Sequence, residues 1–390
     1  MTELKPALAA LGNKSLAAIE PSAIRAVDQN ISSIPGIIKL TLGEPDFAVP
    51  EHIKSATVKA IEDDWSHYAP SMGYMDLREN VAKYLNERFG GQYSAEEVIV
   101  TVGATESIAA ALGALFNPGD TMIVPTPEFP LYSAIGRKNG LNVVEVNTAP
   151  EFIMTPARLQ AVLAKHPDAK ALVLNYPGNP TGVTYTHEEI RALAAAIAET
   201  NLLVLSDEIY AELSYDADHL SLAKLLPTQT LLISGFSKSH AMTGYRVGYV
   251  AGPKELTAQV GKMHQYMVTT VASPMQRAAV EALTHGRGDA AIMRDTYRKR
   301  RDLVLAGLKE VGFDAPTPGG AFYIFAKMPD QFGTDDVQFV YTLAKEAKVG
   351  LVPGSVFGPG GEGYVRLSYA ASTANLEESV RRIQNFVRTH

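Results

Sequence analysis

Seven short apolar segments in the middle of the chain restrict its fold most strongly. They are rich in Val, Ile and Leu, and polar and apolar residues do not alternate along most of them. Strands with this pattern are covered on both faces of a sheet. Helix-like segments separate them, which favours an α/β fold. We predict these strands at residues 98–102, 121–124, 142–146, 171–175, 202–206, 230–234 and 247–251.

Helical spacing is clear at two places between the strands, residues 105–116 and 187–199. After about residue 284 the pattern changes. We expect there a long polar helix, two strands and a last helix that starts near Asn375, with Glu378 completing a capping box. The long helix is predicted at 290–311 and the two strands at 320–326 and 365–369.

The length of 390 residues favours two domains. We predict a large domain at 46–283 and a smaller α+β domain built from 1–45 and 284–390. The basic run at 298–301 is expected on a solvated or interface-lining face of the long helix.

Composition excludes several classes of function. The net charge of −7 argues against a nucleic-acid partner. The chain has no cysteine, which excludes disulfides, thiolate metal sites and cysteine nucleophiles. We expect no metal site, no membrane span and no secretory signal, and therefore a cytoplasmic enzyme.

The segment at 235–248, GFSKSHAMTGYRVG, indicates a chemistry. Lys238 lies among small residues, where its amine can form a Schiff base with a ligand carbonyl. Arg246 follows eight positions later and can hold a phosphate through two hydrogen bonds. Pyridoxal 5′-phosphate carries both an aldehyde and a phosphate, so this cofactor is the one that the pattern favours.

Three other strand ends carry residues that suit the same cofactor. Gly103 opens a strand-to-helix turn whose backbone N–H groups can point at a phosphate. Asn179 lies in a turn-rich segment after a strand, where it can donate to a ring oxygen or a carboxylate. Asp207 closes another strand and can pair with a pyridine nitrogen, and Tyr210 can reach the ring oxygen.

The segment at 358–363 matches the dinucleotide-binding pattern G-x-G-x-x-G. That function needs a strand before the glycines and a helix after them. A strand-like segment follows here instead, so we predict a turn.

Taken together, these motifs resemble those of the class I/II aminotransferases, which are fold-type I pyridoxal-phosphate enzymes, over nearly the whole chain. The resemblance implies a mostly parallel seven-stranded sheet in the large domain, pyridoxal 5′-phosphate as cofactor, and a homodimer with composite active sites. It rests on LGEPD at 42–46, Tyr68, Gly73, Leu77, Arg78, the NPTG turn at 179–182, SDEIY at 206–210, the lysine motif, and VRLSY at 365–369.

The same resemblance implies the roles of individual residues. Lys238 captures the cofactor aldehyde and then moves protons as the general base, with Asp207 and Tyr210 as its catalytic partners. The substrate α-carboxylate is bound by Arg366 and Asn179, with Gly43 closing over it. The expected cofactor contacts are Gly103, Ala104, Thr105, Phe129, Asn179, Asp207, Tyr210, Ser237, Lys238, Arg246 and, from the neighbouring subunit, Tyr68.

Two departures from the family pattern bear on function. Many relatives carry Ser where this chain has Gly235, with Ser234 one position earlier, so the serine that contacts phosphate is Ser234 or Ser237. Some acid-specific relatives carry Lys where this chain has Thr105, which disfavours an aspartate-specific enzyme.

The segments at 239–244, 264–266 and 361–366 are similar to a bacterial subgroup of aromatic and N-acetyl-diaminopimelate aminotransferases. We expect a ping-pong reaction from an L-amino acid of either kind to 2-oxoglutarate. A C–S β-lyase on the same fold would share every cofactor residue and stays open, as does a non-catalytic regulator.

Overall fold

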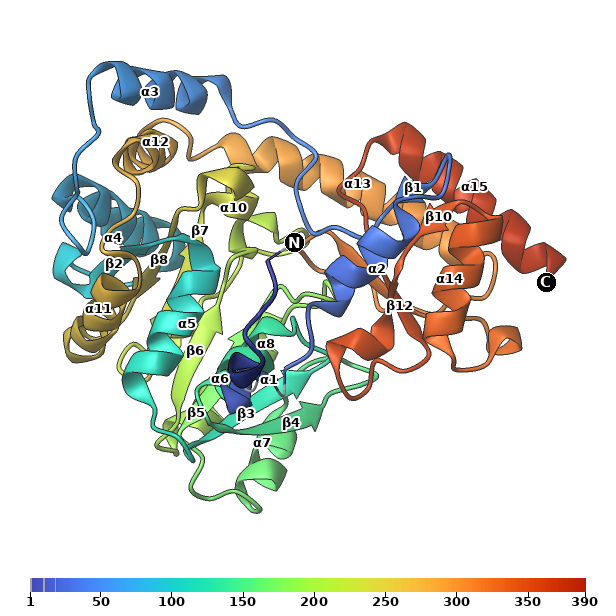
Figure 1. Ribbon diagram of the computed structural model, residues 1–390, viewed down its shortest axis with the longest axis horizontal. Helices are drawn as coiled ribbons and strands as arrows, with labels where there is room; N and C mark the ends of the chain where they lie inside the picture. The colour runs from blue at the N-terminus through green and yellow to red at the C-terminus, as the bar shows by residue number, and fades with distance from the viewer. Residues whose placement is uncertain (1, 10, 18) are drawn as a thin grey trace.

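The computed structural model describes residues 2–9, 11–17 and 19–390. A seven-stranded sheet forms its centre, in the order β2-β8-β7-β6-β5-β3-β4. β8 is antiparallel to both neighbours, and the other pairs are parallel. The prediction of a mostly parallel sheet is confirmed (Figure 1). The strands are β2 (Val98–Thr101), β3 (Thr121–Thr126), β4 (Asn142–Asn147), β5 (Ala171–Asn175), β6 (Leu203–Asp207), β7 (Thr230–Gly235) and β8 (Gly248–Ala251).

Helices cover both faces of this sheet, which is why its strands are apolar on both sides. The helices α5, α6 and α11 pack on one face. The helices α3, α4 and α12 cover one end of the other face, and α7, α8 and α9 cover its other end. The bounds are α3 (Glu51–Glu62), α4 (Met75–Phe89), α5 (Gly103–Leu115), α6 (Leu131–Lys138), α7 (Pro156–Leu163), α8 (His187–Ala198), α9 (Leu222–Leu225), α11 (Lys254–Val268) and α12 (Ser273–Thr284).

A second core lies beside the first, where helices pack on a three-stranded antiparallel sheet of order β11-β12-β9. A two-stranded parallel pair, β1 with β10, adds to it. The domain boundaries at residues 46 and 284 stay predictions. This part contains β1 (Ile38–Lys39), β9 (Tyr323–Lys327), β10 (Val349–Gly350), β11 (Val352–Pro353), β12 (Tyr364–Ser368), α2 (Ala23–Ile31), α13 (Asp289–Lys309), α14 (Asp336–Glu346) and α15 (Thr373–Thr389).

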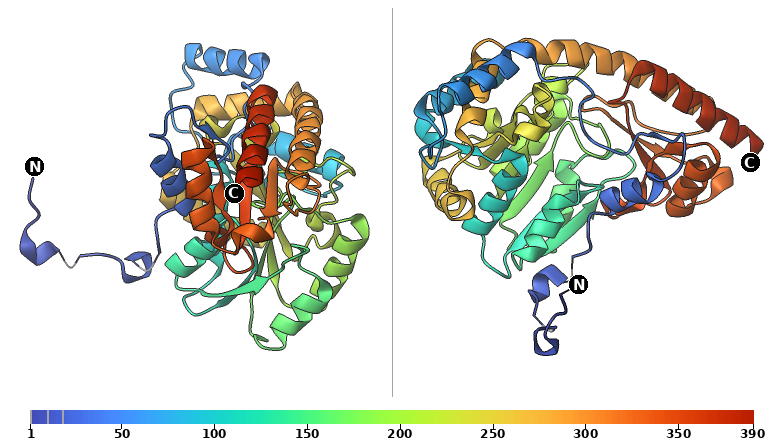
Figure 2. Two further views of the ribbon diagram at one scale, coloured as in Figure 1. Left: turned by 90° about the vertical axis from the view of Figure 1, so that its right-hand side faces the viewer. Right: turned by 45° about the horizontal axis from the view of Figure 1, so that its top comes forward.

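Figure 2 shows α13 running from the large sheet to the small one, with α15 continuing along the same side. One prediction about α13 needs correction. Its basic run does not lie wholly on a solvated face, because Arg301 is 5% exposed and pairs with Asp216 and Asp302. Arg300 bonds Asp46, so this run joins α13 to distant segments of the chain.

The expected start of the last helix was also wrong. α15 begins at Thr373, and Ser372 is its N-cap, accepting a hydrogen bond from the backbone N–H of Asn375. Asn375 is therefore inside the first turn, because a serine three residues earlier satisfies that N–H. The glycine-rich segment before β12 is a turn, as predicted, with positive φ at Gly358, Gly360 and Gly363.

The described N-terminal residues project from the body as an arm, seen most clearly in the left view of Figure 2. It carries the short helix α1 (Lys14–Ala17). Its leucines Leu4, Leu8, Leu11 and Leu16 are exposed. Among the residues that the structure describes, no helix is long and apolar enough to span a membrane.

Candidate active site

The predicted catalytic residues meet at one edge of the large sheet. Asp207 ends β6, and its register partner Asn175 ends β5. Lys238 lies in α10 (Phe236–Ser239), which follows β7 directly. β8 runs the opposite way, so Arg246, which comes just before it, lies at the same edge. Parallel strands thus bring together side chains from distant parts of the chain.

A cavity of about 580 Å³ opens at this edge. Two predicted site residues are not part of its wall. Gly103 lies behind Arg246, and a Cβ added to it would stand 2.6 Å from the Arg246 Nη2. Tyr68 is 86% exposed and does not line this cavity. The predicted residues that line the wall are Gly43, Ala104, Thr105, Phe129, Asn179, Asp207, Tyr210, Ser237, Lys238, Arg246 and Arg366.

Asp207 is buried on the cavity wall and is held from two sides. The hydroxyl of Tyr132 donates to its Oδ2 over 2.8 Å, and the backbone N–H of Ile209 donates to its Oδ1 over 3.1 Å. The amide of Asn175 donates to the Asp207 carbonyl. Burial raises the pKa of Asp207 to about 6, and the Tyr132 hydrogen bond partly offsets this. Asp207 is therefore an anion above pH 6 that would be stabilised by a cationic ligand atom.

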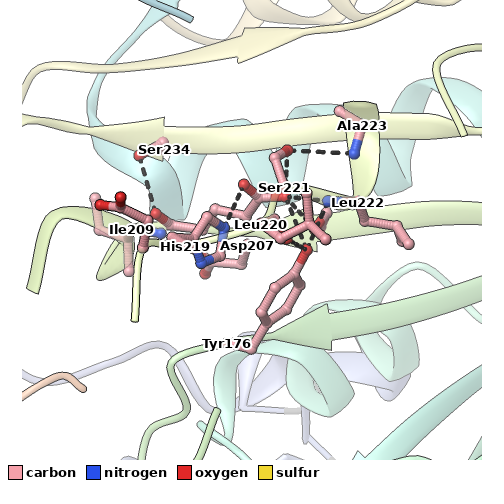
Figure 3. A network of polar contacts seen from close by, with 12 residues as sticks. Tyr176, Asp207, Ile209, His219, Leu220, Ser221, Leu222, Ala223 and Ser234 are labelled. Atoms are coloured by element: carbon pink, nitrogen blue, oxygen red, sulfur yellow. Dashed lines mark hydrogen bonds and ion pairs between the residues drawn. The ribbon is translucent and has the colours of Figure 1, made fainter. Parts of the chain in front are cut away.

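A second carboxylate, Glu208, supports the backbone behind Asp207. It accepts hydrogen bonds from Ser206 (2.8 Å) and Ser221 (3.0 Å), and its other oxygen lies 2.8 Å from His219 Nε2. Figure 3 shows this buried network, in which His219 and Ser221 come from the loop beyond β6. Because each oxygen has a partner, the network holds the turn that carries Asp207.

Lys238 reaches across the cavity. Its Nζ donates to the Gly43 carbonyl over 2.7 Å and lies 5.7 Å from the centroid of the Phe322 ring. Burial lowers the pKa of the Lys238 amine to about 8. Near pH 8 a large fraction of this amine is thus neutral, which is the nucleophilic form that attacks a carbonyl.

An anion site lies at the N-terminus of α5. Gly103 begins this thirteen-residue helix with φ of +76°, and the N-cap residue, Val102, makes no side-chain hydrogen bond. The Arg246 guanidinium stands beside it, donating to the carbonyls of Thr243 (3.0 Å) and Val102 (3.4 Å). Helix N–H groups and a guanidinium together bind phosphate well.

The structure also separates the two candidate serines. Ser237 lines the cavity. The Ser234 hydroxyl instead donates to the Glu208 carbonyl over 3.3 Å, away from the cavity. Ser237 is therefore the serine placed to contact a ligand here.

Arg366, on β12, is 1% exposed at the opposite wall. Its Nη1 donates to Asn179 Oδ1 over 3.0 Å, and its Nη2 donates to the Thr41 carbonyl. Its Nε has no hydrogen-bond partner among the described residues. A buried guanidinium with an unsatisfied N–H is costly unless an anion binds to it. The site thus suits a ligand with a carboxylate.

Comparison with known proteins identifies the family. Residues 35–383 match the model of the family "Aminotransferase class I and II". The chain belongs to the class I and II aminotransferases. It is 44% identical over 370 residues to a probable N-acetyl-LL-diaminopimelate aminotransferase from Bacillus subtilis, covering 95% of this chain and 94% of the relative. It is 36% identical to aromatic-amino-acid aminotransferase 2 from Thermococcus litoralis, covering 95% and 96%.

Solved structures agree with this assignment. The aspartate aminotransferase of Thermus thermophilus with maleate superposes with a TM-score of 0.91 at 37% identity, covering 96% of this chain and 99% of that one. An aromatic aminotransferase from Pyrococcus horikoshii superposes with a TM-score of 0.87 at 36% identity, covering 93% and 99%. The expected fold-type I architecture is confirmed.

This aminotransferase depends on pyridoxal 5′-phosphate, as its family does. The residues present fit that cofactor. The α5 N-terminus with Arg246 matches a phosphate, and Asp207 is the anion that a pyridinium nitrogen requires. Lys238 would supply the amine for the aldehyde. The Oδ1 of Asn179 accepts from Arg366, so its Nδ2 would be the atom that donates to the ring oxygen.

Among the cavity-wall residues that sequence reasoning missed, four bear directly on the geometry of the site. Tyr132 and Asn175 hold Asp207, and Tyr323 bonds the Tyr210 hydroxyl over 2.8 Å. Arg25, from α2, is the fourth. Asn175 closes β5, so the expectation that site residues lie at strand ends could have identified it. The other three come from a helix or another sheet, whose approach to the cavity depends on tertiary packing.

Proposed function

We propose that this aminotransferase moves the amino group of an aromatic L-amino acid or of N-acetyl-LL-diaminopimelate to 2-oxoglutarate by a ping-pong mechanism. The names of the relatives at 44% and 36% identity support these donors. The uncharged Thr105 on the cavity wall supports a donor without a short acidic side chain. The observation that supports 2-oxoglutarate as the acceptor is a third arginine on the cavity wall, in addition to Arg246 and Arg366.

Arg25 is the residue that we assign to the second carboxylate of 2-oxoglutarate. It lines the cavity together with three other cationic side chains, Lys238, Arg246 and Arg366, each of which already has a role. The acid one turn further along α2, Asp28, is bonded to Lys39 and Thr41 rather than to Arg25. Arg25 forms no ion pair among the described residues, and Glu44, a carboxylate on the same wall, accepts from the Thr243 hydroxyl. Arg25 is therefore free to pair with a ligand carboxylate.

Thr41 connects the helix that carries Arg25 with the side chain of Arg366. The Thr41 hydroxyl donates to Asp28 of α2, while the Thr41 carbonyl accepts from Arg366. Ile24 anchors the first turn of α2 in a cluster with Phe325 and Phe357. Two guanidinium groups on one cavity wall, Arg366 buried and Arg25 exposed, suit a substrate with two carboxylates better than one with a single carboxylate.

The remaining residues supply orientation and proton transfer. Arg366 holds the α-carboxylate and so fixes the face on which the substrate Cα–H lies. Lys238, with its pKa lowered to about 8 by burial, takes the Cα proton as a neutral amine. When bound, the cofactor would supply a carrier for the amino group and an electron sink for the pair left at Cα. Asp207 stabilises the positive charge of the ring nitrogen through both halves.

We further propose that the enzyme works as a cytoplasmic homodimer with composite sites. Tyr68 supports this because its ring is exposed and takes no part in the wall of its own cavity. Other large apolar side chains are exposed in the same protomer, including Ile61, Tyr266 and Met267. Exposed apolar area of this kind favours association with a second copy.

The experiment is a panel of amino donors with the purified enzyme, using Phe, Tyr, N-acetyl-LL-diaminopimelate and Asp with 2-oxoglutarate. We expect kcat/KM for Phe, Tyr or the diaminopimelate to exceed that for Asp. Aspartate ahead of all three would contradict the assigned donors.

The acceptor is tested with Arg25→Gln. Because a charged hydrogen bond contributes about 1.5–3 kcal/mol, kcat/KM for 2-oxoglutarate should fall roughly tenfold to a hundredfold. The value for phenylpyruvate, which has one carboxylate, should change less than about twofold. Arg298→Gln on the exposed face of α13 is the matched control. Equal losses for both acceptors would contradict the role of Arg25.

A further inference from the structure

A buried carboxylate–imidazole pair lies next to the cavity but outside it. Glu106 belongs to α5 and is 7% exposed, while His264 belongs to α11 and is fully buried. The His264 Nδ1 lies 3.0 Å from Glu106 Oε1 and 3.2 Å from Oε2. Neither residue lines the cavity, so neither has a part in the proposed reaction.

The two outer ends of this pair are anchored to backbone. The Val102 N–H donates to Glu106 Oε2 over 2.9 Å. At the other end His264 Nε2 donates to the Ser71 carbonyl over 2.8 Å. Because a carbonyl cannot donate, the proton on Nε2 is fixed. The chain of hydrogen bonds therefore runs without a gap from residue 102 to residue 71.

Each anchor belongs to a segment that the site needs. Val102 is the N-cap of α5, and its carbonyl accepts from the Arg246 guanidinium. We call the N-terminus of α5 together with Arg246 the phosphate cradle. Ser71 lies three residues after Tyr68, in the loop that ends at Gly73. A second contact fixes the same loop, since the Val100 N–H donates to the Met72 carbonyl. Cradle and loop thus form one hydrogen-bonded unit.

We propose that Glu106 and His264 are positioning residues that tie the phosphate cradle of one protomer to the loop through which its Tyr68 reaches the partner. The inference rests on the proposed homodimer. In that dimer, Glu106 acts mainly on the cofactor phosphate of its own protomer. His264 acts through the Tyr68 loop on the phosphate of the other protomer, so the pair links cofactor retention in the two sites.

The test uses equilibrium titration of the apoenzyme with pyridoxal 5′-phosphate. His264→Gln should raise its Kd roughly tenfold, which corresponds to about 1.4 kcal/mol and lies within the range for a lost buried hydrogen bond. In a Tyr68→Phe background the same change should raise Kd less than about twofold, because the group through which His264 acts is gone. Glu106→Gln should raise Kd in both backgrounds.

His52→Gln is the matched control. His52 also bridges two groups, Glu281 and Asp289, but contacts neither the cradle nor the Tyr68 loop. Its Kd for the cofactor should stay within about twofold of wild type. The melting temperature of each apo variant is recorded, because a purely structural role would lower it without moving the Kd of the folded protein.

Three results would overturn the inference. These are a wild-type Kd in His264→Gln, an equal effect of His264→Gln with and without the Tyr68 hydroxyl, and a wild-type Kd in Glu106→Gln. Failure of the dimer is recognised separately, because sedimentation of the wild-type holoenzyme as an active monomer would contradict the proposed assembly. A dimer with unchanged Kd values would contradict the positioning role alone.

Discussion

At the scale of single residues, Asp207 shows how function opposes stability. Burial raises the pKa of Asp207 from 3.8 to about 6. The folded protein therefore binds a proton here more tightly than the unfolded chain does. The folded state is most stable below pH 4, where Asp207 is protonated, and loses this stability as the pH rises through 6. At pH 8 the ionised carboxylate costs about 3 kcal/mol of folding free energy in the apoenzyme. Asp207→Asn should therefore raise the free energy of unfolding of the apoenzyme by up to about 3 kcal/mol at pH 8, and by less at pH 5.

Urea unfolding of both apo proteins at the two pH values measures this difference. The same variant should lose turnover by several orders of magnitude, because the ring nitrogen loses its anionic partner. Asp314→Asn, at an exposed carboxylate with no ion pair among the described residues, is the control and should change neither quantity much. A variant that is less stable than wild type at pH 8, or that keeps near-normal kcat, would show that Asp207 only caps its strand.

At the scale of elements, the turn at 179–182 depends on close packing against β9. Gly182 has φ of +67°, and a Cβ there would stand 2.5 Å from the Tyr323 carbonyl. Gly182→Ala should destabilise the protein and lower kcat/KM, because the turn that carries Asn179 must shift. Gly36→Ala isolates the backbone cost, since Gly36 has φ of +73° and no atom within 4 Å of the added Cβ.

Gly36→Ala should cost about 1 kcal/mol and Gly182→Ala clearly more. Thermal unfolding and steady-state kinetics of the two variants provide the comparison. Equal destabilisation with unchanged kcat/KM would mean that the turn does not need to approach Tyr323 closely.

The elements that the sequence predicted well are those with local signals. Apolar runs without alternation located all seven strands of the large sheet, because burial on both faces shows directly in the residues.

Gly103, Asp207 and Lys238 were found because strand ends at one sheet edge form ligand crevices. Tyr132 and Arg25 were not, because whether a helix residue faces the cavity depends on how α6 and α2 pack. The role proposed for Tyr68 depends on a second copy of the chain, and no local pattern encodes such a contact.

At the scale of the whole molecule, composite sites predict complementation between two inactive variants. Lys238→Ala lacks the catalytic amine, and Tyr68→Ala lacks the group offered to the partner. In a mixed dimer one site combines the intact Lys238 of one chain with the intact Tyr68 of the other. Unfolding and refolding an equal mixture should restore about a quarter of wild-type activity, from one good site in each mixed dimer.

Each variant refolded alone is the control. A mixture no more active than the two parents separately would contradict the composite site. Activity retained in Lys238→Ala by itself would contradict the assignment of the catalytic amine.

The central claim is that this cavity transfers an amino group in two separate halves. The most direct measurement is the amount of oxo acid formed when the holoenzyme meets its best donor with no acceptor present. We predict one equivalent of oxo acid per active site, after which the reaction stops, and one equivalent of glutamate when 2-oxoglutarate is then added. Continued release of oxo acid and ammonia without an acceptor would contradict the claim and indicate a lyase.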